Sequence, residues 1–227
     1  MINSNKKRRK KKIKYKNLII IAVILLIIFL IIKGITNIKL KNIYIKGNNY
    51  LTDQQVIDIA GLKEYPKVIK LNKNKLISRL KENDYIEDVE IKFNNFKQEI
   101  NIEIVENRPL VYYQYDESYL LTNASSVKDL NISLPVLINQ TPDLILKKLL
   151  KKLESLDEDI LYRISEIRYY PSKVDEELFY LIMNDGNYIY INFNSFDKLN
   201  NYIDIIKGFD NKKGILHLDS GDYLEIK

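Results

Sequence analysis

The fold of this chain is decided by the stretch LKNIYIKGNNYLTDQQVIDIAG, which runs from Leu40 to Gly61. Its first seven residues alternate apolar and polar side chains, the pattern of a half-buried strand. A glycine and two asparagines then supply the residues of a turn. Thr52 and Gln55 have the spacing of a capping box, which satisfies free backbone N–H groups at the start of a helix. The stretch predicts a strand, a turn and a capped helix that ends at Gly61.

The next elements continue this unit. Residues 73–83 carry apolar side chains on one helical face. Residues 86–93 predict a strand with an irregular register near Asp88, and residues 99–106 alternate strictly as a second strand. The order is therefore β-α-α-β-β over about 70 residues.

Upstream lies an apolar run, Leu18–Ile32, of fifteen consecutive residues without a charge, amide or hydroxyl group. A helix that is apolar on every face must be buried in lipid or in a large core. A membrane span usually needs about 17–25 residues. Lys33 can snorkel and the next three residues extend the run, so we expect a transmembrane signal anchor at residues 18–36. The alternatives are a cleaved secretory signal, disfavoured by the bulky Ile35 at a candidate cleavage position, and a buried helix of a soluble protein.

Charge sets the expected topology. Nine of the 36 basic residues precede the apolar run and no acidic residue does, so we expect residues 1–17 to be a basic cytoplasmic tail. Residues 37–227 are then extracytoplasmic. The rest of the chain has 27 basic and 30 acidic residues. The net charge of +6 therefore comes from the N-terminal basic residues and reflects topology. No nucleic-acid partner is expected, because the basic run has no interleaved aromatic residues and no reader fold follows it.

The composition argues against catalysis. Cysteine is absent, which excludes thiol nucleophiles and thiolate metal sites, and His217 is the single histidine. We expect His217 to be a structural or surface residue, and we expect no catalytic residue, metal or cofactor. Ser125-Ser126-Val127-Lys128 matches the S-x-x-K motif of penicillin-binding enzymes, but its S-D-N and K-T-G partners do not occur, so we expect a loop.

Acidic and aromatic clusters have similarly plain interpretations. Residues 157–159 and 175–177 are acidic runs, which we interpret as solvated turn charges. The rival hypothesis is a small anchored cell-wall hydrolase that uses these carboxylates. Alternating aromatic residues in 179–193 are interpreted as cross-strand pairs, not as a ligand platform.

The second half of the chain predicts a mixed, β-rich domain with flanking helices, so the fold class is α+β. The expected elements are strands at 111–115, 119–122 and 164–170, a helix at 143–156 capped by Asp143, a hairpin at 178–193 with an Asp185-Gly186 turn, a helix at 195–207 and one or two strands in 214–227.

These parts together resemble a known family. The pattern Ile43-x-Ile45-x-Gly47-Asn48-x-x-Leu51-Thr52, followed by two helices, a hairpin and Val105-Glu106-Asn107-Arg108-Pro109, resembles a POTRA domain. A POTRA domain directly after a basic tail and one signal anchor resembles the bacterial cell-division family FtsQ/DivIB. The family's short LPVL stretch is similar to residues 134–137. Tyr85 and Phe96 depart from the family pattern, which often has prolines at these places.

The resemblance implies a domain organisation and a function. We expect a POTRA domain at residues 37–107 and a β domain at 108–227. The implied function is that of a non-enzymatic scaffold of the divisome at the septum, which links early and late division proteins and helps control septal wall synthesis. Its implied partners are FtsB/DivIC-like and FtsL-like proteins, with FtsW and a penicillin-binding transpeptidase as further candidates. The alternative is a membrane-anchored POTRA protein in secretion or envelope assembly.

A partner site is expected at the end of the chain. An edge strand presents unpaired backbone groups to which another strand can add. The competing interpretation is a core strand whose edge is blunted by lysines at 212, 213 and 227. The resemblance favours binding, and it implies a surface made of Lys198, Tyr202, Leu218, Ser220, Tyr223, Glu225 and Ile226.

Overall fold

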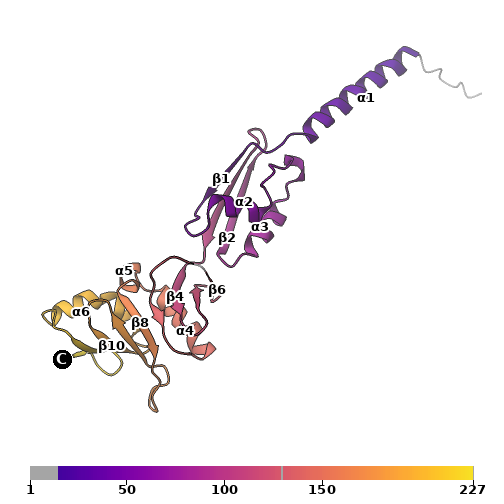
Figure 1. Ribbon diagram of the computed structural model, residues 1–227. Coiled ribbons are helices and arrows are strands. Elements are labelled where there is room, and N and C mark those ends of the chain that lie inside the picture. Colours follow the sequence, from indigo (N-terminus) through magenta and orange to yellow (C-terminus); the bar gives the residue numbers. More distant parts are fainter. Residues whose placement is uncertain (1–14, 129, 227) are drawn as a thin grey trace, which may run out of the picture.

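The computed structural model describes residues 15–128 and 130–226, and it shows one long helix followed by two sheets placed end to end (Figure 1). Helix α1, Tyr15–Thr36, projects from the rest of the chain and has no buried residue. It is the one helix in the described part that is long and apolar enough to cross a membrane. The predicted anchor at 18–36 lies within α1, whereas residues 1–14 of the predicted tail lie outside the described residues.

The first sheet has the predicted β-α-α-β-β order. Its strands stand in the order β1-β3-β2, with β1 parallel to β3 and β3 antiparallel to β2. The elements are β1 (Asn42–Lys46), α2 (Asp53–Ala60), the 3-10 turn η1 (Val68–Lys70), α3 (Lys73–Lys81), β2 (Ile86–Asn94) and β3 (Glu99–Glu106). The register shifts between Ile86 and Asp88, as the sequence predicted.

The local signals that predicted this unit are confirmed. The Thr52 Oγ1 atom accepts a hydrogen bond from the Gln55 backbone N–H at 3.3 Å, and the Gln55 side chain accepts one from the Thr52 N–H at 2.8 Å. Gly61 ends α2 in the left-handed conformation, with φ of 71°. The two helices bury Val56, Ala60, Leu76 and Leu80 against the isoleucines of β2 and β3.

A single carboxylate binds the loop at the end of this sheet that lies away from α1. Glu106, the last residue of β3, accepts hydrogen bonds from the backbone N–H groups of Asn49, Tyr50 and Leu51 at 2.6, 2.8 and 2.9 Å. Bonds from N–H groups to an ionised acceptor are stronger than neutral ones. Glu106 therefore fixes the loop between β1 and α2.

The residues after Glu106 form a bonded joint between the two sheets. Asn107 is buried; its amide donates to the Asp84 carbonyl at 2.9 Å, and its Oδ1 atom accepts from the Thr122 hydroxyl at 3.1 Å. The Arg108 guanidinium donates to the Glu154 carbonyl, at the end of a helix in the second unit, at 2.7 Å. The joint is thus held by side chains and not by a free linker.

The second sheet has nine strands in the described residues, in the order β12-β11-β10-β9-β8-β7-β4-β5-β6. Their bounds are β4 (Pro109–Tyr113), β5 (Ser118–Leu121), β6 (Ser126–Val127), β7 (Val136–Leu137), β8 (Ile164–Tyr169), β9 (Phe179–Met183), β10 (Tyr188–Ile191), β11 (Gly214–His217) and β12 (Tyr223–Ile226). Strand β12 stands at one edge.

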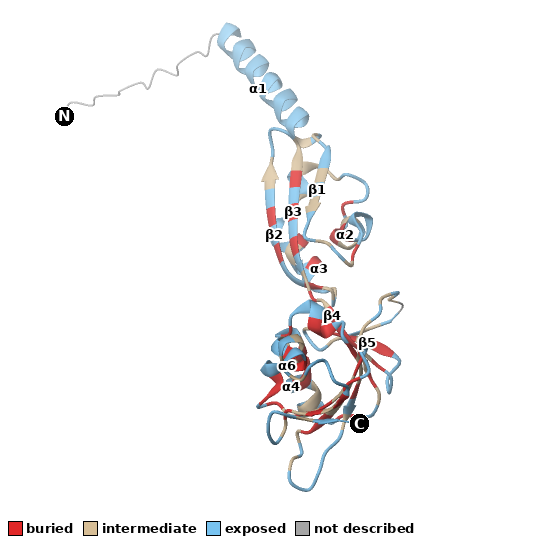
Figure 2. Cartoon of the chain, turned by 90° about the vertical axis from the view of Figure 1, so that its left-hand side faces the viewer, coloured by how far each residue is buried: buried red, intermediate tan, exposed pale blue. Residues whose placement is uncertain are grey.

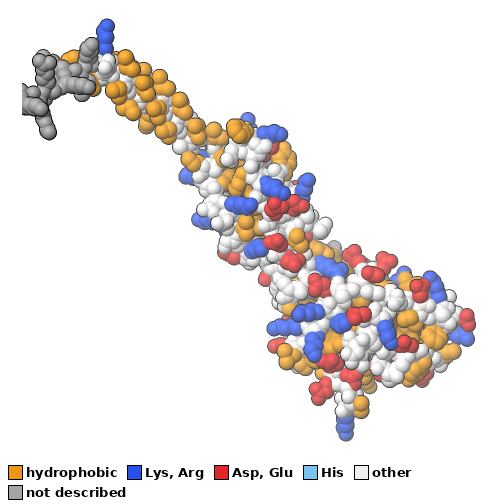
Figure 3. Space-filling view, turned by 180° about the vertical axis from the view of Figure 1, so that it is seen from behind, with side chains coloured by type: hydrophobic (Ala, Val, Ile, Leu, Met, Phe, Trp, Pro, Cys, Tyr) orange, Lys and Arg blue, Asp and Glu red, His pale blue; other side chains and the backbone are white. Residues whose placement is uncertain are grey.

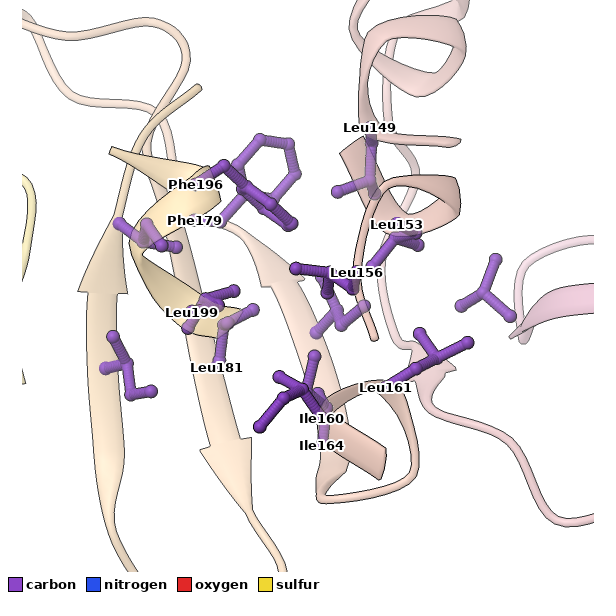
Figure 4. Close-up of a cluster of buried hydrophobic side chains, with 14 of the residues drawn as sticks. Leu149, Leu153, Leu156, Ile160, Leu161, Ile164, Phe179, Leu181, Phe196 and Leu199 are labelled. Atoms are coloured by element: carbon purple, nitrogen blue, oxygen red, sulfur yellow. The ribbon is translucent and has the colours of Figure 1, made fainter. Parts of the chain in front are cut away.

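Helices cover one face of this sheet (Figure 2). They are α4 (Asp143–Glu154), α5 (Glu158–Leu161), the 3-10 segment η2 (Phe196–Asn201) and α6 (Tyr202–Gly208). In the core, leucines of α4 and η2 face the aromatic and aliphatic side chains of β9, with Ile160 and Leu161 of α5 below them (Figure 4). This core is separate from that of the first sheet.

Three details differ from the expectations. Asp143 is the first helical residue of α4 and not its cap; the capping position is held by Pro142, without a side-chain hydrogen bond. The β9–β10 connection has an extra residue, because Met183 N–H bonds to the Asn187 carbonyl around the left-handed Gly186. The helix expected at 195–207 begins as the 3-10 segment η2. Short elements such as α5 and β6 were not predicted, since they are too brief to show a period.

Candidate partner-binding site

The edge strand β12 lies close against a glycine of the neighbouring strand. Strand β12 runs antiparallel to β11, with Gly214 opposite Ile226 and His217 opposite Tyr223. A Cβ atom on Gly214 would lie 2.0 Å from the Glu225 carbonyl oxygen, which is not sterically allowed. Within the described residues the other side of β12 has no paired strand, so its backbone groups are free to receive one.

Four of the predicted site residues lie together on this edge. Ser220, in the β11–β12 turn, is exposed, and so is Glu225. Tyr223 is 49% exposed and Ile226 is 59% exposed, a high value for large apolar side chains. The edge thus combines backbone hydrogen-bonding groups with an aromatic and an aliphatic side chain.

Lys198 has a positioning contact. Its ammonium group lies 2.6 and 3.0 Å from the two carboxylate oxygens of Asp222, in the β11–β12 turn. Both side chains are about half exposed, so solvent screens this ion pair. The pair still links η2 to the turn that carries Ser220.

Tyr202 and Leu218 lie behind the surface. Each is 2% exposed. The Tyr202 hydroxyl donates to the Asp185 carboxylate at 2.8 Å and accepts from the Asn187 amide at 2.9 Å. The Asn187 Oδ1 atom accepts from the Gly214 N–H at 3.1 Å. This chain of bonds joins α6 to the start of β11, so Tyr202 positions the edge without being part of it.

The same network predicts a loss of stability at alkaline pH. Burial, together with the bond to Asp185, raises the pKa of Tyr202 well above its usual 10.0, and burial also raises the pKa values of Tyr180 and Tyr190. Above pH 10 the unfolded chain loses these protons while the folded chain keeps them. The free energy of unfolding should therefore fall as pH rises past that point. Urea unfolding of the full chain in detergent, followed by circular dichroism below and above pH 10, measures this.

A Tyr202→Phe variant is the control. It should lose about 1–2 kcal/mol of stability at neutral pH, because Asp185 and Asn187 lose a partner. Its free energy of unfolding should decline less steeply above pH 10 than that of the wild type. An equally steep decline in the variant would exclude Tyr202 as a source of the effect.

An aromatic stripe crosses the face of the second sheet that the helices leave open. Tyr180 on β9 lies 5.7 Å from Tyr188 and 4.8 Å from Tyr190, measured between ring centroids, which confirms cross-strand pairing. The His217 ring stacks between Tyr190 at 5.3 Å and Tyr223 at 4.5 Å. The stripe therefore continues to the edge strand, a continuity that no local sequence pattern reveals because it spans strands distant in sequence.

The motifs considered for catalysis lie in structural contacts. Ser125 follows a turn and donates to the Asn123 side chain, and it does not begin a helix as an S-x-x-K serine would. Glu158 accepts a bond from the Tyr162 hydroxyl, and Asp175 accepts one from the Asn192 amide. In the described residues no group of three or more His, Cys, Asp or Glu side chains is arranged to hold a metal ion.

Comparisons with known proteins agree with this architecture. Residues 38–107 match the family model described as "POTRA domain, FtsQ-type". The cell division protein DivIB of Bacillus subtilis (strain 168) is 29% identical over 198 residues, which cover 82% of this chain and 74% of that protein. DivIB of Bacillus anthracis is 30% identical over 192 residues, covering 81% and 72%.

A solved structure is also similar. It is the major extracytoplasmic domain of DivIB from Geobacillus stearothermophilus, in the trans isomer, with 26% identity and a TM-score of 0.38. The match covers 47% of this chain and 96% of that domain.

The long apolar helix, the first sheet and the β-rich second sheet define a membrane-anchored POTRA protein with an extracytoplasmic region. The similarity to the DivIB proteins covers most of the chain and identifies the family within this class. The chain belongs to the FtsQ/DivIB family of bacterial cell-division proteins.

Proposed function

We propose that this protein is a non-enzymatic scaffold of the divisome, which links early and late division proteins and helps control septal wall synthesis. It captures FtsB/DivIC-like and FtsL-like partners through its β domain, and FtsW and a penicillin-binding transpeptidase are further candidate partners. Membership in a cell-division family supports this role over the alternative of secretion or envelope assembly.

The observation that carries the proposal is the open edge at β12. Strand addition to such an edge takes its affinity from main-chain hydrogen bonds and its specificity from alternate side chains. Tyr223 and Ile226 are the large exposed side chains of β12, and Ser220 and Glu225 flank them. Lys198 and Tyr202 support the edge through the contacts described above, and Leu218 is buried behind it.

The proposed organisation follows the expected boundaries. Residues 1–17 are a cytoplasmic tail and 18–36 the signal anchor. Residues 37–107 are the POTRA domain and 108–227 the β domain, both on the extracytoplasmic side of the septal membrane. The basic residues before α1 support this direction of insertion.

The absence of catalysis rests on composition and on the contacts of the candidate groups. The chain has no cysteine, and its one histidine is stacked between two tyrosines. Carboxylates of the acidic runs accept hydrogen bonds from protein groups, as Asp175 does from the Glu177 N–H at 2.8 Å and from the Asn192 amide at 2.9 Å. These contacts support the interpretation of structural carboxylates over a hydrolase.

The test is co-purification from membranes with the full chain and a double variant, Tyr223→Ala with Ile226→Asp. The wild type should retain the FtsB/DivIC-like and FtsL-like proteins, and the variant should lose them at least tenfold. The matched control replaces an exposed tyrosine and an exposed aliphatic residue away from the edge, Tyr115→Ala with Val174→Asp, which are 62% and 98% exposed.

The outcomes separate the function from the site. Retention by the wild type and by both variants would overturn the assignment of the edge. Failure of the wild type to retain any division protein would overturn the scaffold. Circular dichroism of each variant confirms that the fold is intact.

A further inference from the structure

An apolar groove lies at the end of the first sheet where α1 joins it. Its volume is about 450 Å³. Its lining includes Ile35, Ile38, Val68, Ile69 and Phe96. Figure 3 shows hydrophobic side chains gathered at this end of the first sheet, next to the apolar helix, with basic side chains around them.

The residues at the mouth of this groove are unusually exposed for their size. The Phe96 side chain, in the β2–β3 loop, is 100% exposed, and Ile69 of η1 is 61% exposed. Ile35, in the last turn of α1, is 57% exposed. Contiguous exposed apolar side chains from three separate segments mark a contact surface.

The segments that form the groove are hydrogen-bonded to the residues that follow α1. The Val68 N–H donates to the Ile38 carbonyl at 2.9 Å, and the Lys67 ammonium group lies 2.5 Å from the Asn37 side-chain oxygen. The Lys41 N–H donates to the Gln98 carbonyl, at the base of the β2–β3 loop, at 2.8 Å. The groove therefore stays next to the end of the helix.

The length of the apolar run bears on where the groove lies relative to the bilayer. Fifteen residues of α-helix rise about 22 Å, whereas the hydrocarbon core of a bilayer is about 30 Å thick. Residues that flank the run at one end or both must therefore enter the membrane for α1 to span it. Ile35 is one of these flanking residues and also lines the groove, so a span that uses the residues after Lys33 would bring the groove to the level of the lipid headgroups.

The charge around the groove fits an anionic surface. Six lysines lie within three residues, along the chain, of a lining residue named above: Lys33, Lys39, Lys41, Lys67, Lys70 and Lys97. In the part of the chain that the structure describes, none of these lysines forms an ion pair with an acidic side chain. The nearby acidic residue Glu99 is bonded to the Asn42 amide at 3.3 Å.

We propose that this groove docks onto the outer surface of the bilayer. Phe96 and Ile69 insert among the acyl chains near the headgroups, and the surrounding lysines contact anionic headgroups. The first sheet is then held at the membrane by a second contact besides α1, which fixes its tilt. This inference does not depend on the proposed partner edge.

The chain has no tryptophan, so Phe96→Trp places a single tryptophan at the tip. The full-length variant is reconstituted into phosphatidylcholine vesicles containing phosphatidylglycerol, with bromine atoms on the upper acyl chain. The Phe96→Trp variant should emit at shorter wavelength than a Tyr115→Trp control in the second sheet, and bromine should quench only the former. Tyr115 is a suitable control because it too is exposed.

Two results would overturn the proposal. One is an emission spectrum equal to that of the control without quenching, which means that the tip stays in water. The other is a blue shift without bromine quenching, which means that protein, such as a second copy of the chain or the helix of a partner, covers the groove.

A charge-reversal pair tests the lysines. In the Phe96→Trp background, Lys70→Glu with Lys97→Glu should reduce quenching several-fold in vesicles with phosphatidylglycerol. The matched pair Lys147→Glu with Lys151→Glu, on exposed positions of α4, should leave it unchanged. Equal quenching in both pairs would overturn the role of the anionic headgroups.

Discussion

Replacing Gly214 by alanine should displace β12 and reduce partner retention at least tenfold in the membrane co-purification. The added Cβ atom would lie 2.0 Å from the Glu225 carbonyl oxygen and 3.1 Å from the Ile226 Cα atom. Both are backbone atoms, so no side-chain rotation relieves the clash. The stability of the second sheet should fall by about 1–3 kcal/mol, as for other overpacked sites.

Gly208→Ala is the matched control for this substitution. Gly208 ends α6 and has no other atom within 4 Å of the added Cβ. Its replacement should leave partner retention unchanged. If Gly214→Ala retained its partners as well as this control, the edge strand would not be the binding element.

The second large effect is expected at Gly47, in the turn after β1. Gly47 has φ of 83°, and a Cβ atom there would lie 2.0 Å from the Ile104 carbonyl oxygen of β3. Alanine would meet both the strain of the left-handed conformation and a backbone clash. We expect a loss of about 3–4 kcal/mol, a large fraction of the stability of a small domain.

The matched control for Gly47→Ala is Gly186→Ala. Gly186 also has a positive φ, of 91°, but no atom lies within 4 Å of its added Cβ. Its replacement should therefore cost only the conformational strain, about 1–2 kcal/mol. Urea unfolding of the two full-length variants compares them, and equal losses would contradict the role of the Ile104 contact.

Local sequence signals predicted the first sheet well because its elements have their own start, stop and alternation signals. The capping box at Thr52 and Gln55, the glycine after α2 and the alternation in 99–106 each act within a few residues. The second sheet was predicted less completely. Its β7 and β6 strands have two residues each and form through pairing with distant strands, which a local pattern does not encode.

The candidate site was predicted in part for the same reason. Exposed β12 residues such as Tyr223 follow from an edge strand that alternates its side chains. The burial of Tyr202 and Leu218 depends on packing between α6 and β11, which are brought together by the Asn187 network. Likewise, the exposure of Phe96 follows from the position of the β2–β3 loop at the end of the sheet, and the sequence shows only an apolar residue in a turn.

The bonded joint at Asn107 and Arg108 has a consequence for reach. Its side chains bond to both sheets, and these bonds couple the two sheets along the elongated arrangement that Figure 1 shows. If the edge at β12 binds membrane proteins as proposed, this joint would hold that edge at a set distance from α1. A partner would then need a stalk long enough to reach it, and stalk length would become a criterion for binding.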